Sequence, residues 1–256
     1  MLIQRARTLF ALVLRELEVG QGAGLGSLFW AVLEPVFGIV LLTIIFTIAL
    51  PSPPLGESFA LFYATGLLPL ILFQDVTQKM VIAARFSRPL FGFSAIRLCD
   101  VLLARFFSTL LVQLLASSVV LFCLGWFEGG FSSADFVGVA RAYAALVTLS
   151  FGTGYLGCWL AMIWAIWPRV WAVILRPLVF ISGIFFLVDE IGDPFRDWLL
   201  WSPLAHVIAA VRAGLYSDYH ADLASLGYVV SVGAGLALVG VSGIGLNQTK
   251  LIDGLV

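Results

Sequence analysis

Residues 35–56 read PVFGIVLLTIIFTIALPSPPLG and contain no Asp, Glu, Lys or Arg. An apolar run of this length matches the about 20 residues that an α-helix needs to cross the hydrocarbon core of a bilayer. Five further windows also lack these charged residues, and they cover 58–74, 106–127, 142–168, 177–188 and 223–249. Hydrophobic residues make up 61% of the chain, whereas soluble domains contain about 45–50%. The sequence therefore predicts an all-α integral membrane protein with six transmembrane helices.

Two of the windows need neighbouring residues to reach membrane length. The second window must continue to Met80, and the fifth must begin near Val170, which places Arg176 in its first turns. Continuously apolar runs favour helices, because the strands of a membrane β-barrel alternate apolar and polar residues. We expect one transmembrane domain over residues 27–250, followed by a tail over residues 251–256.

The loops between the windows differ in charge. Of the 14 basic residues, the larger group falls on one side of the predicted helices and consists of Arg5, Arg7, Arg15, Lys79, Arg85, Arg88, Arg97, Arg105, Arg169, Arg176 and Lys250. The other side holds Arg141, Arg196 and Arg212, together with most of the acidic residues. Because Lys and Arg accumulate in cytoplasmic loops, both termini are predicted to lie in the cytoplasm.

The N-terminal segment, residues 1–26, has its own pattern. Apolar side chains recur at steps of three and four, at Leu2, Ala6, Leu9, Val13 and Leu17. This spacing predicts an amphipathic helix on the cytoplasmic surface of the membrane. Its longest apolar run is too short for a cleaved signal peptide, and the glycines that follow predict a flexible joint to the first crossing.

The chain lacks the residues with which transporters bind ATP. A P-loop needs Gly-Lys followed by Ser or Thr, but neither of the two lysines, Lys79 and Lys250, is followed by either. Asp75 is the acid that comes closest to the middle of a predicted helix, where ion-coupled carriers place one. We expect no cofactor on this chain, and a separate cytoplasmic ATPase that binds ATP and magnesium. No metal site is expected, because His206 and His220 lack matching Cys or carboxylate spacing.

Small residues spaced four apart recur within the membrane windows. The stretch GTGYLG at residues 152–157 matches the dinucleotide-binding pattern, but no strand precedes it and it lies inside a window. Rows of small residues let helix backbones approach closely in membranes. The predicted packing rows are Thr153 with Gly157 and Ala161, Ser231 with Gly235, and Gly233 with Ala237.

Residues 188–219 form an unusual segment on the predicted outer side. Ser202 and Pro203 interrupt its apolar stretch 199–216, so this stretch is too broken to cross the membrane. We expect two short re-entrant helices, which are tolerated where protein or a water-filled cavity surrounds them, and which would line a gate. A loop at the membrane interface, where aromatic residues are common, is the alternative.

Charged residues near the cytoplasmic side allow two interpretations. Four arginines belong to or border the loop after the second predicted helix, namely Arg85, Arg88, Arg97 and Arg105. They attract an anionic substrate to the mouth of a path, or they reflect membrane topology alone. Glu34 pairs with one of them, Arg97 or Arg105, or it is a charge at the mouth of the first crossing with Pro35 in the tolerated first turn.

Two further groups carry functional predictions. Residues expected to contact the ATPase come from the N-terminal helix and the same loop, and they are Glu16, Glu18, Pro89 and Asp100. Membrane anchoring alone is the alternative for the helix. Trp30, Trp159 and Trp164 either line the path by stacking on sugar rings or anchor helices at the interface.

Three segments together resemble a known family. They are LGSLFWAVLEP at 25–35; GLLP at 66–69 with PLFG at 89–92 and DVLLAR at 100–105; and RPLVFISGIFF at 176–186 with WSPLAH at 201–206 and Arg212. In order and spacing they are similar to the permease subunit of bacterial ABC exporters for capsular polysaccharide, over nearly the whole chain. Such permeases usually carry Asn where this chain has Ser202, and both residue types cap helix starts.

The resemblance implies a function. A chain of this family forms a homodimer in the bacterial inner membrane, binds two copies of the ATPase, and exports a lipid-linked acidic polysaccharide to the periplasm. A periplasmic co-polymerase and an outer-membrane channel would be further partners. The residues implied for the outer gate are Trp201, Pro203, His206, Arg212 and Tyr216. The chain would be a transport subunit and not an enzyme.

Two alternatives stay open. The cargo could be another lipid-linked glycan, such as O-antigen or teichoic acid, or a drug-like lipid. A membrane glycosyl or acyl transferase is the alternative from another class, and it would use the outer acids Asp189, Glu190 and Asp193. Gly192 and Pro194 beside them are ordinary turn residues, which favours a solvated turn instead.

Overall fold

The computed structural model describes residues 2–19, 25–86, 97–128 and 134–253. Within these ranges the chain forms helices and no strand, which confirms the predicted all-α class. The elements are α1 (Leu2–Val19), α2 (Leu25–Ala49), α3 (Phe59–Val81), α4 (Ala83–Phe86), α5 (Leu98–Phe127), α6 (Phe136–Ile163), α7 (Trp167–Leu175), α8 (Leu178–Ile181), the 3-10 helix η2 (Val188–Glu190), α9 (Phe195–Leu200), α10 (Pro203–Leu215) and α11 (Leu226–Asp253).

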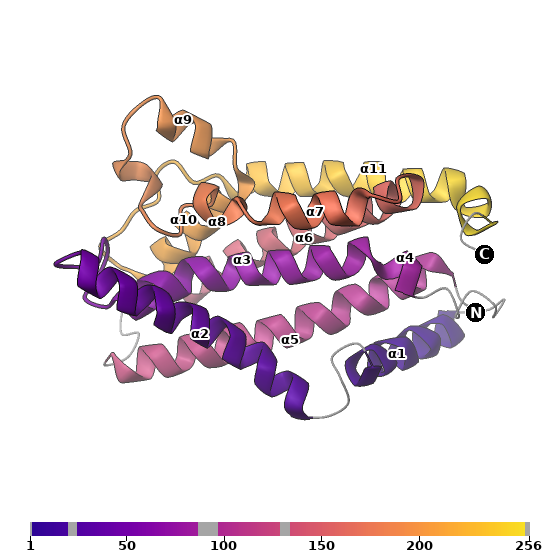
Figure 1. Ribbon diagram of the computed structural model, residues 1–256, viewed down its shortest axis with the longest axis horizontal. Coiled ribbons are helices and arrows are strands. Elements are labelled where there is room, and N and C mark those ends of the chain that lie inside the picture. Colours follow the sequence, from indigo (N-terminus) through magenta and orange to yellow (C-terminus); the bar gives the residue numbers. More distant parts are fainter. Residues whose placement is uncertain (1, 20–24, 87–96, 129–133, 254–256) are drawn as a thin grey trace.

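Five helical stretches in the described ranges are long and apolar enough to cross a membrane. They are Phe29–Ala49, Phe59–Val81, Leu98–Phe127, Phe136–Ile163 and Leu226–Leu246. They correspond to the first, second, third, fourth and sixth predicted crossings, and their helices run along the length of the molecule (Figure 1). Each of these continuously apolar stretches of sequence thus forms a long helix, as its hydropathy predicts.

The fifth predicted crossing is not one helix. It divides into α7 and α8 at Arg176 and Pro177, and the chain after α8 turns at Gly183, whose φ is +77°. Proline cannot donate a backbone hydrogen bond and its ring crowds the preceding turn, so a helix is interrupted there. The side-chain amide of Gln74 on α3 donates to the carbonyl of Leu175 at 2.9 Å and satisfies the end of α7.

The first crossing begins earlier than expected. Pro35 lies inside α2 and not in its first turn, because the helix starts at Leu25. At the other end, the prolines of residues 51–54 end the helix, so that α2 stops at Ala49. The predicted window was therefore shifted toward the C-terminus.

The two ends of the bundle hold different elements (Figure 1). We call one end the α4 end, because α4, the start of α1 and the end of α11 lie there. The opposite end holds α9 and α10, and we call it the α9 end. Both chain ends thus lie at one end of the molecule, and their predicted place in the cytoplasm remains an expectation.

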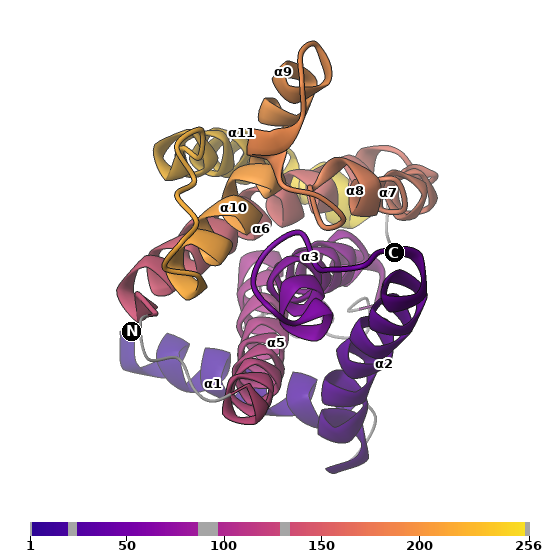
Figure 2. The same cartoon turned by 90° about the vertical axis from the view of Figure 1, so that its left-hand side faces the viewer.

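The N-terminal helix packs on protein. Figure 2 shows α1 crossing α5, which is its main neighbour. Leu12 and Glu16 are buried in this contact, whereas Phe10 and Leu14 on other faces of α1 are exposed. A helix forms where the spacing predicts it, and its buried face contains a carboxylate, whereas its place on the membrane surface stays a prediction.

The packing of α11 on α6 depends on glycine. A Cβ added to Gly233 would lie 2.8 Å from the Cα of Leu149, and one added to Gly152 would overlap the carbonyl oxygen of Gly233. The predicted row of Gly233 with Ala237 therefore lies at a close helix contact. Gly235 faces open space in the described structure, so the predicted row of Ser231 with Gly235 is not a contact row.

Residues 188–219 contain two short helices, α9 and α10, and their predicted re-entrant place in the membrane stays a prediction. Residues of α10 are almost all buried, and the helix packs against α6, α3 and α11. In contrast, α9 projects from the bundle with Phe195 and Trp198 exposed (Figure 2). Ser202 stands at the N-cap of α10, but its side chain makes no capping hydrogen bond in the described structure, contrary to expectation.

Candidate functional site

An ion pair joins α1 to α5 at the α4 end. Arg105 donates from Nε to Glu16 Oε2 at 3.1 Å and from Nη2 to Oε1 at 3.3 Å. The two side chains are only 11% and 10% exposed, and the Arg105 guanidinium also lies 5.7 Å from the centroid of the Phe86 ring. The expected pairing of Glu34 with Arg105 is not found among the described residues, because Arg105 is turned toward α1.

Other predicted residues at this end make local contacts. Arg85 donates from Nη2 to the carbonyl of Ala165 at 2.6 Å and links α4 to the turn after α6. The exposed Arg97 precedes α5, and its backbone N–H donates to Asp100 Oδ2 at 3.1 Å. Asp100 therefore stabilises the start of α5, where a negative charge is favourable. Arg88, Pro89 and the side chain of Glu18 lie outside the described residues.

A polar cluster lies between α3 and α5. Asp75 Oδ2 accepts from Lys79 Nζ at 3.1 Å and from Gln113 Nε2 at 2.7 Å. Sequence analysis singled out Asp75 but missed Gln113, because 38 residues separate them in the chain. The charge of Lys79 is thus paired with that of Asp75 at a partly exposed site.

The predicted aromatic residues do not form one cluster. Trp30 is exposed on α2, and Trp164 is exposed where α6 ends. The Trp164 ring lies 6.3 Å from that of Trp167, which stacks on Trp171 at 6.5 Å. Trp159 is half-buried at the contact of α6 with α11, where a Cβ on Gly243 would overlap its ring. The structure therefore gives Trp159 a packing role.

Arg212 lies buried at the α9 end, with 1% of its surface exposed. It donates from Nη1 to the carbonyls of Gly183 at 2.8 Å and Phe186 at 2.9 Å, and from Nη2 to Ile184 at 2.8 Å. Its guanidinium carbon lies 4.1 Å from the centroid of the Phe62 ring. A positive charge here is held by carbonyl oxygens and an aromatic face.

The remaining predicted gate residues surround α10. His206 is hydrogen-bonded through Nε2 to the carbonyl of Leu200 at 2.8 Å, and its Nδ1 accepts from the backbone of Ser225 at 3.2 Å. Pro203 occupies the first turn of α10, while Trp201 just before it is 81% exposed. Tyr216 ends α10 and lies against Gly56, where any Cβ would overlap its ring.

The outer acids are engaged in local contacts. The hydroxyl of Tyr219 donates to Asp189, and burial together with this bond raises the pKa of Tyr219 above its usual value. Asp193 pairs with Arg196 at 2.8 Å. No group of three or more His, Cys, Asp or Glu in the described part of the chain could hold a metal ion. Local contacts of this kind are typical of a folded loop.

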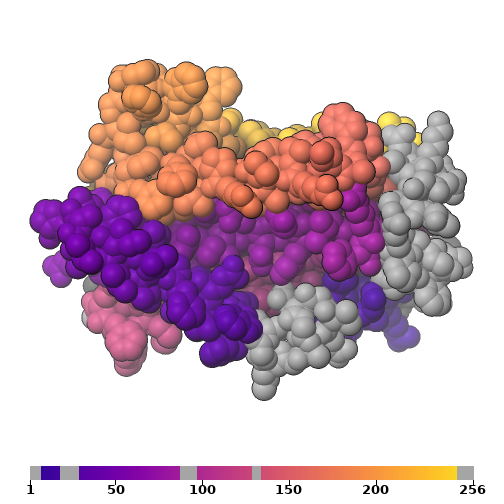
Figure 3. Space-filling view, viewed as in Figure 1, coloured from indigo at the N-terminus to yellow at the C-terminus, as the bar shows by residue number. Residues whose placement is uncertain are grey.

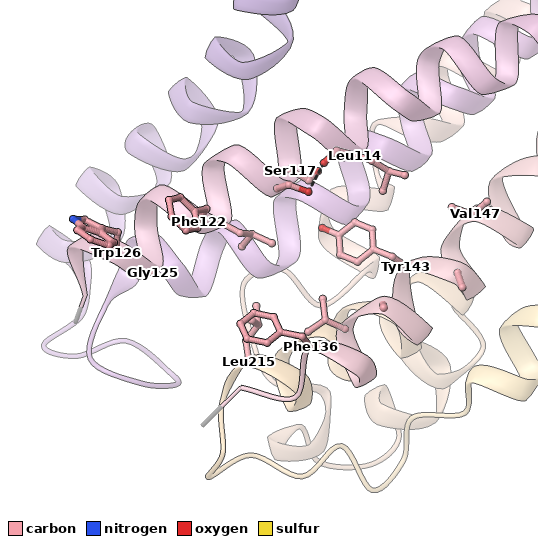
Figure 4. A pocket seen from close by; sticks show the side chains of 14 residues that line it. Leu114, Ser117, Phe122, Gly125, Trp126, Phe136, Tyr143, Val147 and Leu215 are labelled. Carbon is pink, nitrogen blue, oxygen red and sulfur yellow. Dashed lines mark hydrogen bonds between the residues drawn. The ribbon is translucent and has the colours of Figure 1, made fainter. Parts of the chain in front are cut away.

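A groove of about 760 Å³ opens between α5 and α6. Figure 4 shows Phe122 and Trp126 on one wall and Phe136 and Tyr143 on the other, with the Tyr143 hydroxyl turned toward α5. A smaller groove of about 300 Å³ lies between α2 and α5. The residues that line these two grooves are all uncharged.

An aromatic cluster that the sequence did not reveal joins three elements. Phe185, between α8 and η2, lies 5.7 Å from Phe46 on α2, 6.5 Å from Tyr63 on α3 and 5.6 Å from Phe180 on α8, measured between ring centroids. The local sequence pattern could not predict this aromatic cluster, because α2 and Phe185 are distant in the chain.

Comparison with known proteins connects this architecture to capsule export. No family model matches the chain. The polysialic acid transport protein KpsM of Escherichia coli is 29% identical over 237 residues, which cover 90% of this chain and 92% of KpsM. The capsule polysaccharide export inner-membrane proteins CtrC of Neisseria meningitidis and BexB of Haemophilus influenzae are 21% and 20% identical, and the matches cover 94% and 92% of this chain and 91% and 89% of theirs. The chain is a homologue of the inner-membrane proteins of capsule polysaccharide export.

Proposed function

We propose that this chain is the transmembrane subunit of an ATP-driven exporter that moves a lipid-linked capsular polysaccharide from the cytoplasm to the periplasm. Two copies would form the conduit between them, with both termini of each in the cytoplasm. The support from the comparisons is that the relatives are named for polysialic acid transport and capsule polysaccharide export. The support from the structure is a pair of exposed charges within apolar segments.

The observation that carries the proposal is the exposure of Arg176 and Glu34. Glu34 lies five residues after the start of the candidate span Phe29–Ala49, about 8 Å along it at 1.5 Å per residue, and Arg176 stands at the C-cap of α7, just before Pro177. Both side chains are exposed, and neither has an ion-pair partner among the described residues. A charge facing lipid costs about 2.5–3.5 kcal/mol or more, so these side chains need water or protein around them.

The elements that carry these charges form one side of the molecule. Figure 3 shows part of the largely buried α3 at the surface between α2 and the α7–α8 segment. In a two-fold dimer each copy contributes the same surface. Pairing this side with its copy would surround the exposed charges with protein and water, and would place a polar path along the dimer axis.

The charges that remain unpaired favour an acidic cargo. Glu16 neutralises Arg105 and Asp75 neutralises Lys79, so these two cations are not free to bind substrate. Arg176 and Arg97 are exposed, and Arg85 donates to the carbonyl of Ala165. Guanidinium groups bind phosphate and carboxylate oxygens with charge-assisted hydrogen bonds. We therefore assign Arg85 and Arg97 to the cytoplasmic mouth and Arg176 to the path.

The motor would be a separate ATPase that docks at the α4 end. Neither lysine of the chain has the sequence context of a P-loop. The bidentate contact of Arg105 with Glu16 would carry a movement of α1 to α5, and Asp100 would keep the start of α5 rigid. A periplasmic co-polymerase and an outer-membrane channel would receive the polymer.

Deletion of the gene in its own bacterium tests the proposal. Polymer should accumulate inside the cell and disappear from the surface, and the plasmid-borne chain should restore surface polymer. Unchanged surface polymer after deletion would overturn the proposal. Chemical analysis of the accumulated polymer separates a capsular polysaccharide from O-antigen or teichoic acid.

Reconstitution tests the division of labour. The purified chain alone in liposomes should hydrolyse no ATP and move no glycan, and both activities should appear when the partner ATPase is added. ATP hydrolysis by the chain alone would contradict a separate motor.

A further inference from the structure

The buried guanidinium of Arg212 bonds a segment that has no regular structure. Its three carbonyl acceptors belong to Gly183, Ile184 and Phe186, which follow the end of α8. Its Nε donates at 3.4 Å to the hydroxyl of Thr65 on α3, which itself donates to the carbonyl of Phe62 at 2.7 Å. Arg212 therefore connects α10, α3 and the segment 183–186.

These contacts answer a specific need of the backbone. Carbonyls that leave a helix and remain buried require donors, and broken helices at membrane depth persist only where such groups are satisfied. Ser182, Gly183 and Ile184 are buried, with Ser182 and Ile184 fully so. Arginine suits the task because it offers five donors in a planar array and is weakly hydrated.

The space for this arrangement depends on a glycine. A Cβ added to Gly66 of α3 would lie 3.2 Å from the Cα of Ile184 and 3.3 Å from Nη2 of Arg212. The segment 183–186 and the Arg212 guanidinium that bonds it therefore both lie directly against α3 at Gly66.

The same segment places an aromatic ring at the α9 end. Phe185 stands between two of the residues whose carbonyls Arg212 binds, and it contacts Phe46, Tyr63 and Phe180. A rotation of the segment would remove Phe185 from this aromatic cluster. The guanidinium thus bonds the backbone on both sides of this ring.

We propose that Arg212 is a positioning residue for transport: it ties the segment 183–186 to α10, so that both move as one unit and the Phe185 cluster closes the α9 end of the path between transport events. This inference rests on the proposed function for its meaning in transport, but the attachment itself can be tested without it.

Two matched cysteine reporters test the attachment. Ser182 and Ser150 are both fully buried, and each serine hydroxyl bonds a carbonyl of its own helix. Ser182 borders the segment, whereas Ser150 lies in the middle of α6. S182C and S150C would be introduced separately after Cys99, Cys123 and Cys158 are replaced by alanine. The readout is the labelling rate with a membrane-impermeant maleimide in proteoliposomes.

With Arg212 intact, both reporters should react slowly. In R212Q, labelling of S182C should rise about tenfold or more, because local opening exposes the site, while S150C stays protected. R212K should give an intermediate rate, since an ammonium offers fewer donors than the guanidinium. Continued protection of S182C in R212Q would overturn the proposal, and equal exposure of both reporters would show general unfolding and overturn it as well.

Leakage tests the role in transport. Liposomes that contain the chain and a small trapped dye should release the dye several times faster with R212Q than with the wild type, because the outer closure is lost. The control is R196Q, which removes an outer arginine that pairs with Asp193 in a loop. If S182C labelling rises in R212Q but the dye is not released faster, closure of a path by the Phe185 cluster is refuted, while the inference that Arg212 attaches the segment 183–186 stands. No change in either measurement would refute the attachment itself, and absence of export by the wild type would instead refute the proposed function.

Discussion

Glu16 and Arg105 are joined by two hydrogen bonds of 3.1 and 3.3 Å across 89 residues of chain. The pair lies where α1 crosses α5 and is nearly buried, so each charge depends on the other for its solvation. Sequence analysis assigned one residue to ATPase coupling and the other to the substrate mouth. The geometry makes them parts of one connection between a surface helix and a membrane-length helix.

Replacing either partner should loosen α1. We expect Glu16→Ala or Arg105→Ala to cost about 2 kcal/mol of stability, since hydrogen bonds to charged groups contribute about 1.5–3 kcal/mol. The measurement is a double-mutant cycle on thermal unfolding in detergent, with protease sensitivity of α1 as a second readout. Arg15→Ala removes a neighbouring exposed charge and should have little effect. Equal losses from Arg15→Ala and Glu16→Ala would contradict the assigned contact.

The contact of α6 with α11 should be sensitive to a single methyl group. Gly233→Ala places a Cβ 2.8 Å from backbone atoms of Leu149, which cannot move without separating the helices. A loss of about 1–3 kcal/mol is expected from such overpacking. Gly235→Ala, two residues away in open space, is the matched control and should be neutral or slightly stabilising. The measurement is thermal unfolding of both variants in detergent. An unchanged unfolding temperature in Gly233→Ala would show that α6 and α11 lie farther apart than described.

The polar cluster between α3 and α5 should stabilise the bundle. Gln113→Leu removes the donor that lies 2.7 Å from Asp75 Oδ2 and leaves that oxygen the hydrogen bond from Lys79. We expect a loss of about 1–3 kcal/mol, because a partly buried acceptor loses a hydrogen bond. The comparison is Gln78→Leu on the same helix as Asp75, measured by thermal unfolding. Similar values for both variants would mean that Gln113 is not a specific partner.

Exposed charges in the apolar segments should matter for transport more than for folding. Arg176→Gln and Glu34→Gln should each lower surface polymer about tenfold or more, because a charge-assisted contact to the cargo or to the second copy is lost. Their thermal unfolding temperatures should stay near that of the wild type, since both side chains are exposed. Arg196→Gln, in the first turn of α9, is the control for loss of one arginine. Normal surface polymer in both variants would remove the support for a conduit on this side.

Alkaline conditions should weaken the outer loop. Burial and the bond to Asp189 raise the folded-state pKa of Tyr219 above the unfolded value of about 10. The neutral phenol is therefore favoured by folding, and its contribution is complete below about pH 10 and is lost as the pH rises further. Tyr219→Phe should make the unfolding temperature fall less steeply above about pH 10. An unchanged slope would exclude Tyr219 as the titrating group.

Much of the fold could be predicted because hydropathy acts locally. The windows at 106–127, 142–168 and 223–249 all became long helices, since an uninterrupted apolar run has few alternatives in a membrane. The window at 177–188 failed as a single helix because Pro177 and Gly183 act on the backbone within it. The start of the first helix was misjudged, because Pro35 was taken as a boundary although the helix continues through it.

The amino-acid sequence by itself determined the all-helical class, the amphipathic N-terminal helix, the two short helices around Pro203 and the likeness to capsule exporters. These depend on hydropathy, periodicity and local backbone chemistry, which neighbouring residues set among themselves. Only the tertiary structure decided that Arg105 bonds Glu16, that Gln113 bonds Asp75, and that Arg212 holds the carbonyls of residues 183–186. Such contacts join residues far apart in the chain, and their partners are chosen by the way whole helices pack, which no local pattern encodes.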